Sequence, residues 1–238
     1  MKKQLFSSIA CFALLILMFL GSTIAWFTDT KDSVNTMVAG RITIEQTEEF
    51  DGTKILLPSM KVPKKVTVQN TGNQPCYVRT LFAFEDSADG EVLKMISTQG
   101  ATIVLPGVTP GTGDQKVQFQ VTVTDAEGKA TTTIFTVGYY VHPEALAVGA
   151  SFTSMESFTL DANAGNDWLN AIGEKYEILV LSQASQMTGL ENLSVEEALN
   201  TAFNVISSDS CVTWFAYVLN HTDGYVPVGG QLSVTTNP

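Results

Sequence analysis

The chain contains two histidines, and their positions limit the catalytic chemistry that the sequence could support. His142 stands in His142-Pro-Glu144 after an alternating apolar run, and His221 lies far downstream. Neither belongs to a His-Glu-x-x-His sequence, which places two zinc ligands and a general base on one helix face. The chain also lacks the Gly-x-Ser-x-Gly elbow that exposes a nucleophilic serine. We therefore expect no catalytic residues, although the plentiful acidic residues leave open a secreted hydrolase with paired carboxylates.

Cys76 and Cys211 are candidates for a disulfide, which export from the cytoplasm would allow. Each also sits in an apolar run, where a buried free thiol is common, so both interpretations stay open. Two cysteines and two widely spaced histidines have no metal-ligand spacing, and we expect neither a metal nor another cofactor. The stretch from Asp161 to Asp167 begins like a calcium loop, but Asn166 and Ile172 occupy positions where an EF-hand has glycine and an acid. An exposed turn is the expected structure there, and calcium binding remains an alternative.

Charge excludes some partners. The 238 residues include 13 basic and 24 acidic side chains, giving a net charge of −11. A surface of this sign repels phosphate backbones and anionic lipid headgroups, so we expect no nucleic-acid partner. The length is sufficient for one sizeable core.

The N-terminal region has the order of features found in a secretory signal. Lys2 and Lys3 precede an apolar run from Leu5 to Leu20, and small residues follow that run. Thr23 and Ala25 occupy the −3 and −1 positions, and Trp26 would be the first residue after the cut. The sequence thus predicts a signal peptide at 1–25 and a protein that acts outside the cell, with no membrane segment after cleavage. A retained anchor is the alternative, although the run is shorter than the ~20 residues that cross a bilayer.

Short strand-like segments separated by turn residues follow a polar leader at 26–40. Val117–Thr124 alternates strictly, which puts its glutamines and threonines, among them Gln118, towards water and indicates a sheet with one wet side. Asp125-Ala-Glu-Gly128 predicts a hairpin. Lys64 and Lys65 are expected to be solvated charges at a sheet edge. The other expected strands are Ile42–Ile44, Val66–Gln69, Cys76–Phe84, Thr131–Val141, Phe152–Leu160 and Tyr176–Leu181.

Two of these segments are predominantly apolar. In the segment that begins at Cys76, alternation places Val78, Phe82 and Phe84 on one face. Tyr77, Arg79 and Leu81 lie on the other face. Ile178–Leu181 is apolar throughout, which predicts a central strand.

One helix is clearly signalled near 194–206. Ser194 and Glu197 have the spacing of a capping box, and apolar residues from Val195 to Ile206 recur at helical spacing. We therefore predict an all-β fold: a single domain at 41–238 forming a jelly-roll-like antiparallel β-sandwich with one C-terminal helix packed on it. The segment 212–238, which contains Trp214, Phe215 and Tyr217, is either a last strand or a docking surface.

Several motifs resemble the TasA/camelysin-like exported proteins of Gram-positive bacteria, several of which build biofilm-matrix fibres. Gly21, Thr23, Ala25, Phe27 and Asp29 are similar to the family's signal end and the aromatic and acidic pair after it. Ala39-Gly40 then leads into Arg41–Glu45, and Val66–Asn73 with Tyr77-Val-Arg79 resembles a second family signature. Tyr176–Gln186 followed by Val195–Phe203 resembles the ending of clostridial-type members. Arg41, a charge after Ala-Gly, and the bulky Trp26 depart from the pattern.

The resemblance implies a dedicated signal peptidase, which would recognise Thr23, Ala25 and Trp26, and assembly of identical copies into filaments at the cell surface or in the extracellular matrix. It also implies that the processed N-terminal segment adds as a strand to the neighbouring subunit. The residues of that candidate inter-subunit strand are Phe27, Asp29, Val38, Ala39, Gly40, Ile42 and Ile44.

Three alternatives stay open. The leader could be a stub left by processing, without a role in assembly. The protein could instead be a non-polymerising surface adhesion module that binds a polysaccharide, another matrix component or a cell-wall protein. The name camelysin denotes a metalloprotease, but the zinc motif that such an activity requires is missing here.

Overall fold

The structure is a computed structural model, and it describes residues 40–51, 56–106, 116–165, 168 and 176–236. The predicted signal peptide lies outside these residues, with Thr23, Ala25 and Trp26, and so do Phe27, Asp29, Val38 and Ala39 of the candidate strand. The chain divides after Ala39 into two units, and everything below concerns the second, Gly40–Pro238. Among the described residues, no helix is both long and apolar enough to cross a membrane.

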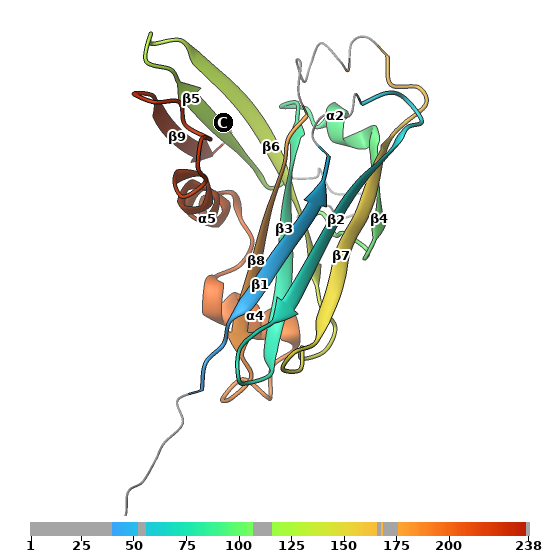
Figure 1. Cartoon of the computed structure of the whole chain (residues 1–238), viewed down its shortest axis with the longest axis vertical. Coiled ribbons are helices and arrows are strands. Elements are labelled where there is room, and N and C mark those ends of the chain that lie inside the picture. Colours follow the sequence, from blue (N-terminus) through green and yellow to red (C-terminus); the bar gives the residue numbers. More distant parts are fainter. Residues whose placement is uncertain (1–39, 52–55, 107–115, 166–167, 169–175, 237–238) are drawn as a thin grey trace, which may run out of the picture. The chain divides into compact units, whose positions relative to one another are not determined.

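Two antiparallel sheets form the unit (Figure 1). The four-stranded sheet has the order β1-β2-β7-β4, with β1 at Ile44–Phe50, β2 at Lys61–Asn70, β7 at Ser151–Leu160 and β4 at Ile96–Gly100. The five-stranded sheet has the order β8-β3-β6-β5-β9, with β8 at Ile178–Gln186, β3 at Cys76–Asp86, β6 at Ala130–Val141, β5 at Gln118–Thr124 and β9 at Gln231–Thr236. Most consecutive strands lie in opposite sheets, as in a jelly roll. The predicted all-β antiparallel sandwich is confirmed.

The sandwich interior follows from strand alternation. In β2, residues alternate between buried and exposed, and Val66 and Val68 point inward. From β3, Phe82 and Phe84 meet Val66 and Met155 of the four-stranded sheet. The opposite face of β3 is also buried, so all eleven of its residues lie inside the protein.

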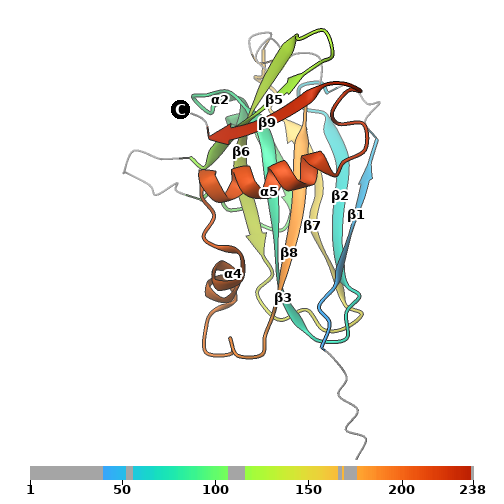
Figure 2. The same ribbon diagram turned by 90° about the vertical axis from the view of Figure 1, so that its left-hand side faces the viewer.

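Two helices cover the outer face of the five-stranded sheet, where one was predicted. Helix α4 spans Val195–Phe203, and the predicted capping box is present, with Ser194 accepting from the amide of Glu197. Helix α5 spans Ser208–Asn220 and crosses the sheet (Figure 2). A shorter helix, α2, forms a single turn at Glu91–Lys94.

Helix α5 was missed at the sequence level, although signals for it exist. Its own capping box pairs Ser207 with Ser210. Ser210 is the third residue of the helix, a position where a capping box usually has Glu or Gln. Cys211, Phe215 and Leu219 recur every four residues and are all buried. Within the segment 212–238, the aromatic residues singled out from the sequence therefore lie on a helix, and of the described residues there only Gln231–Thr236 form a last strand, β9.

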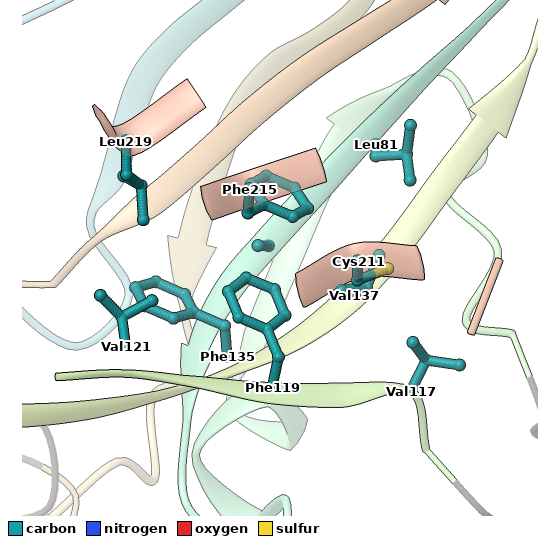
Figure 3. Close-up of a cluster of buried hydrophobic side chains, with 10 residues drawn as sticks. Leu81, Val117, Phe119, Val121, Phe135, Val137, Cys211, Phe215 and Leu219 are labelled. Atoms are coloured by element: carbon teal, nitrogen blue, oxygen red, sulfur yellow. The ribbon is translucent and has the colours of Figure 1, made fainter. Parts of the chain in front are cut away.

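The apolar side of α5 packs on the sheet (Figure 3). The ring of Phe119 from β5 stacks on Phe215 with centroids 5.0 Å apart and on Phe135 of β6 at 5.4 Å. The four apolar residues of the alternating segment at 117–124 all join this cluster. One face of this segment was predicted to lie towards water. At Gln118 that face instead lies towards the sandwich interior. That side chain is buried and donates to Thr136 Oγ1 at 2.9 Å.

Three further predictions need correction. The first strand spans Ile44–Phe50 instead of Ile42–Ile44, because Ile44 pairs with Asn70, where β2 ends. The strand at Ile178 is an edge strand and not a central one; it is apolar on both faces because the sandwich lies on one side and α5 on the other. Lys64 is buried on an interior strand, where its Nζ lies 2.7 Å from Glu48 Oε2 and over the ring of Phe50.

Candidate functional site

An apolar groove runs beside the outer edge of β8, and it is the most distinctive surface feature of the described residues. Its volume is about 460 Å³. One wall comes from the second half of β8, one from α5 and the end of α4, and one from the residues that lead into β1. The lining residues are Ile42, Ile44, Leu181, Ser182, Gln183, Ala184, Phe203, Thr213, Trp214, Tyr217 and Val218.

The groove begins where a side-chain bridge between the two sheets ends. Strand β8 pairs with β3 on one side only, and no described strand pairs with its other side. Gln46 of β1 reaches that outer side: it accepts from Ser182 Oγ at 2.7 Å and donates to the carbonyl of Val180 at 3.5 Å. Beyond this bridge, Gln183 and Ala184 of β8 line the groove. An extended peptide placed there could pair with β8.

A second hollow of about 490 Å³ lies next to the first, and Ile42 lines both of them. Its walls are Gly40, the turn at Gln74-Pro75, and the chain that follows β8 as far as Glu191. Together the two hollows follow β8 from Leu181 to its end. The stretch of β8 from Leu181 to Gln186 is long enough to pair with several residues of an extended strand.

A buried arginine holds the walls of the groove together. Arg79 of β3 is fully buried, and its three nitrogens donate to three segments: Nε to Gln183 Oε1 at 2.7 Å, Nη1 to Asn200 Oδ1 at 2.8 Å and Nη2 to the carbonyl of Asn204 at 3.2 Å. The guanidinium also lies over the rings of Trp214, at 5.1 Å, and Phe203, at 5.9 Å.

These contacts tie β3, β8, α4, the connection after α4 and α5 to one side chain. Burial lowers the pKa of Arg79 to about 10, while the nearby Cys211, Glu196 and Tyr139 oppose the shift. The group therefore stays protonated at neutral pH. Sequence reasoning placed Arg79 on the correct face of β3 but assigned it no role. A charged residue at the centre of the run Cys76–Phe84 was the available signal, because such a charge needs several partners.

Of the candidate inter-subunit strand, the structure describes Gly40, Ile42 and Ile44. Ile42 and Ile44 pack on the chain's own core beside Val68 and Val78, and Ile44 pairs with Asn70 of β2. Both isoleucines also line the groove.

The other candidate residues are not brought together. Cys76 and Cys211 are buried free thiols in two different core clusters, which corresponds to the second of the two interpretations left open. Burial raises the pKa of Cys76, and it raises that of Cys211 to about 12, so neither thiol is an activated nucleophile. His142 Nδ1 lies 2.8 Å from the carbonyl of Glu144 in a turn after β6.

The loop at 161–167 is described as far as Gly165. Asp161 accepts from the backbone and side-chain nitrogens of Asn163, at 2.7 and 2.9 Å, as in an ordinary turn. Across the described residues, His, Cys, Asp and Glu side chains nowhere gather in a group of three that could hold a metal ion.

One carboxyl group has an altered acidity. Burial raises the pKa of Glu85 on β3 to about 7, and the neighbouring charge of Glu177 contributes to the rise. Glu85 Oε2 accepts from the amide of Glu177 at 2.9 Å, and Tyr225 donates to Glu177 Oε2 at 3.2 Å. These hydrogen bonds tie Tyr225, which follows α5, and the residue before β8 to the end of β3.

No model of a known protein family matches the chain, and no curated protein does either.

Proposed function

We propose that this protein is exported and acts as a non-enzymatic structural subunit of extracellular biofilm-matrix or cell-surface fibres, as a TasA/camelysin-like protein of a Gram-positive bacterium. In this proposal a signal peptidase cuts after Ala25, and the freed segment of one copy lies as a strand in the groove of the next copy. The observation that carries the proposal is the apolar groove beside the unpaired half of β8.

The chemistry of an added strand fits this groove. The backbone of β8 beyond Ser182 supplies hydrogen-bonding groups along one side, and apolar side chains such as Leu181 and Trp214 supply a surface for alternate residues of the strand. Met37, Val38 and Ala39 are the apolar and small residues that directly precede Gly40. The aromatic and acidic pair Phe27 and Asp29 comes earlier in the sequence of the same segment.

Geometry favours donation to a neighbour. Because Ile42 and Ile44 pack into their own sandwich, the segment before Gly40 is the part that is available for exchange. A strand that leaves one copy and enters an identical groove on the next makes a head-to-tail contact. Repetition of such a contact does not close on itself and produces a filament.

A charged residue in the groove tests the proposal. Thr213 is exposed on α5, lines the groove and donates to the carbonyl of Asp209 at 3.2 Å. Thr213→Arg should leave the fold intact and abolish filaments in negative-stain electron microscopy. Thr201→Arg is the matched control, since Thr201 is an exposed helical threonine with the same type of hydrogen bond, to Glu197 at 2.9 Å, outside the groove. Filaments formed equally by both variants would reject the groove as the acceptor.

Removal of the donor provides a second test. Deletion of residues 26–39 from the exported protein should abolish filaments and leave a folded monomer, as judged by circular dichroism and size-exclusion chromatography. Unchanged filaments would mean that the leader is only a stub left by processing. N-terminal sequencing of the native secreted protein would check the cut before Trp26.

A surface binding module is the second candidate, and one observation favours it. Tyr217 is about two-thirds exposed beside the groove, and its ring stacks on His221 with centroids 4.2 Å apart. Exposed aromatic rings of this kind can bind sugars or peptides. A protein that stays monomeric by size-exclusion chromatography, even with preformed filament seeds, would support this candidate over a fibre subunit. Casein hydrolysis that a chelator abolishes would instead indicate a protease.

A further inference from the structure

The two sheets present four edge strands among the described residues, and three of them carry features that hinder pairing with another copy. Strand β1 carries Glu45, Glu48 and Glu49, so two copies of it would repel one another. Strand β4 has five residues and a register irregularity between Gln99 and Gly100. The outer side of β8 is blocked by Gln46 at Val180 and Ser182, and the rest of it is the acceptor in the strand exchange proposed above.

Strand β9, Gln231–Thr236, has no such protection. It contains no charged residue and no proline, and its pairing with β5 is regular from Gln231 to Thr236. No described strand pairs with its other side. Val234 and the threonines are β-branched residues that favour extended structure. Natural proteins rarely leave a regular, uncharged edge of this kind without a partner.

We propose that β9 pairs with β9 of a second copy of this chain, in an antiparallel arrangement about a twofold axis. The charge of the molecule favours this occupant. At a net charge of −11, two copies repel one another over most of their surfaces, and a neutral edge lets them approach without placing carboxylates side by side. The contact joins two five-stranded sheets into one continuous sheet.

Side-chain alternation fixes the register of this contact. Leu232 and Val234 are partly buried against the cluster under α5, while Ser233 is exposed on the other face. If Ser233 lies on the twofold axis, Leu232 of each copy lies opposite Val234 of the other copy. The apolar row then continues on the same face, under both α5 helices. A shift by one residue would place apolar side chains opposite exposed ones.

This contact is independent of the strand exchange proposed above, because it uses the opposite end of the five-stranded sheet. A six-residue edge is small, and we expect pairing between free copies to be weak. Within a filament many copies of β9 are held in a row, and their simultaneous pairing raises the overall avidity. The inference therefore assigns β9 to lateral contacts between filaments.

Cysteine cross-linking tests the register directly in the full-length exported protein. Two cysteines introduced by Ser233→Cys would meet at the axis, whereas Cys76 and Cys211 are buried and do not compete. Under mild oxidation, Ser233→Cys should give a disulfide-linked dimer as its main product. Ser97→Cys is the matched control, because Ser97 is an exposed serine on the edge strand β4. An equal or lower yield at position 233 would overturn the inference.

Two further variants separate lateral pairing from filament formation. Ser233→Lys should abolish bundling of filaments in electron micrographs while single filaments persist, and Ser97→Lys should leave bundles unchanged. The double variant Thr213→Arg/Ser233→Cys should form no filaments yet still cross-link. Because pairing between free copies is weak, the comparison is with Thr213→Arg/Ser97→Cys at the same high protein concentration. A yield at position 233 no greater than that of this control would show that β9 does not pair without the strand-exchange contact, and the inference would be wrong.

Discussion

Helices α4 and α5 both bury apolar side chains on the same sheet, among them Ala198 and Leu199 of α4, but α4 is also held by hydrogen bonds from a buried arginine. Helix α5 places Cys211, Phe215 and Leu219 into a cluster of apolar side chains (Figure 3). Near the end of α4, by contrast, Asn200 and the carbonyl of Asn204 receive hydrogen bonds from the buried Arg79. Apolar packing tolerates small displacements, whereas hydrogen bonds fix positions and directions. We infer that α5 contributes more than α4 to the stability of the folded protein, and that Arg79 sets the shape of the groove wall.

The largest loss of stability should follow from truncation of the apolar contact. Phe215 is fully buried and stacks on Phe119. Phe215→Ala should lower the free energy of unfolding by about 3–5 kcal/mol, through lost burial and an incompletely filled cavity. Urea denaturation followed by fluorescence measures this change. A loss below about 1 kcal/mol would mean that α5 is not a major part of the core.

Removal of the guanidinium should cost less but act more locally. Arg79→Met keeps most of the apolar stem and leaves Gln183, Asn200 and the carbonyl of Asn204 without their donor. We expect a loss of about 2–3 kcal/mol, mainly because the buried side chain of Gln183 is left unsatisfied. Hydrogen exchange should accelerate in α4 and change little in α5. A uniform acceleration in both helices would contradict a specific role of Arg79 at α4.

The capping box of α4 should contribute a smaller amount. Ser194 accepts from the amide of Glu197, and Glu197 Oε2 accepts from the amide of Ser194 at 2.9 Å. Ser194→Ala should destabilise the protein by about 1 kcal/mol. Ser207→Ala at the cap of α5 is the comparison, and thermal unfolding of both variants shows whether the two helices depend equally on their caps.

The last effect concerns Glu85, and unlike the others it should depend on pH. Its pKa in the folded protein is about 7, above its ordinary value of 4.5, so the folded state binds more protons than the unfolded state between these values. Stability therefore falls as pH rises from 4.5 through 7. Glu85→Gln keeps a neutral acceptor for the amide of Glu177. The variant should match the native protein near pH 4.5, exceed it in stability at pH 8, and show a flatter profile in between.

The sequence predicted much of the sandwich because alternation is a local signal. The strands at Cys76, Val117, Thr131 and Phe152 were placed within a few residues of their observed bounds. The capping box at Ser194 gave the start of α4. These features depend on side chains close together in the chain, which can be read without knowledge of the fold.

Features that depend on strand order were not predictable from one sequence. The run Ile178–Leu181 is equally apolar in a central strand and in an edge strand covered on both faces. The groove draws on residues as distant as Ile42, Ala184 and Trp214, which only the fold brings together. Gln118 and Lys64 are buried because they bond to partners on other strands, Thr136 and Glu48. No local sequence pattern predicts those pairs.

The central claim is that the groove beside β8 receives a strand from a neighbouring copy. Hydrogen exchange of assembled filaments, compared with unassembled protein, tests it most directly. The account predicts new protection of backbone amides on the outer side of β8 between Ser182 and Gln186, with little change in β3. Filaments in which these amides exchange as fast as in the monomer would contradict it.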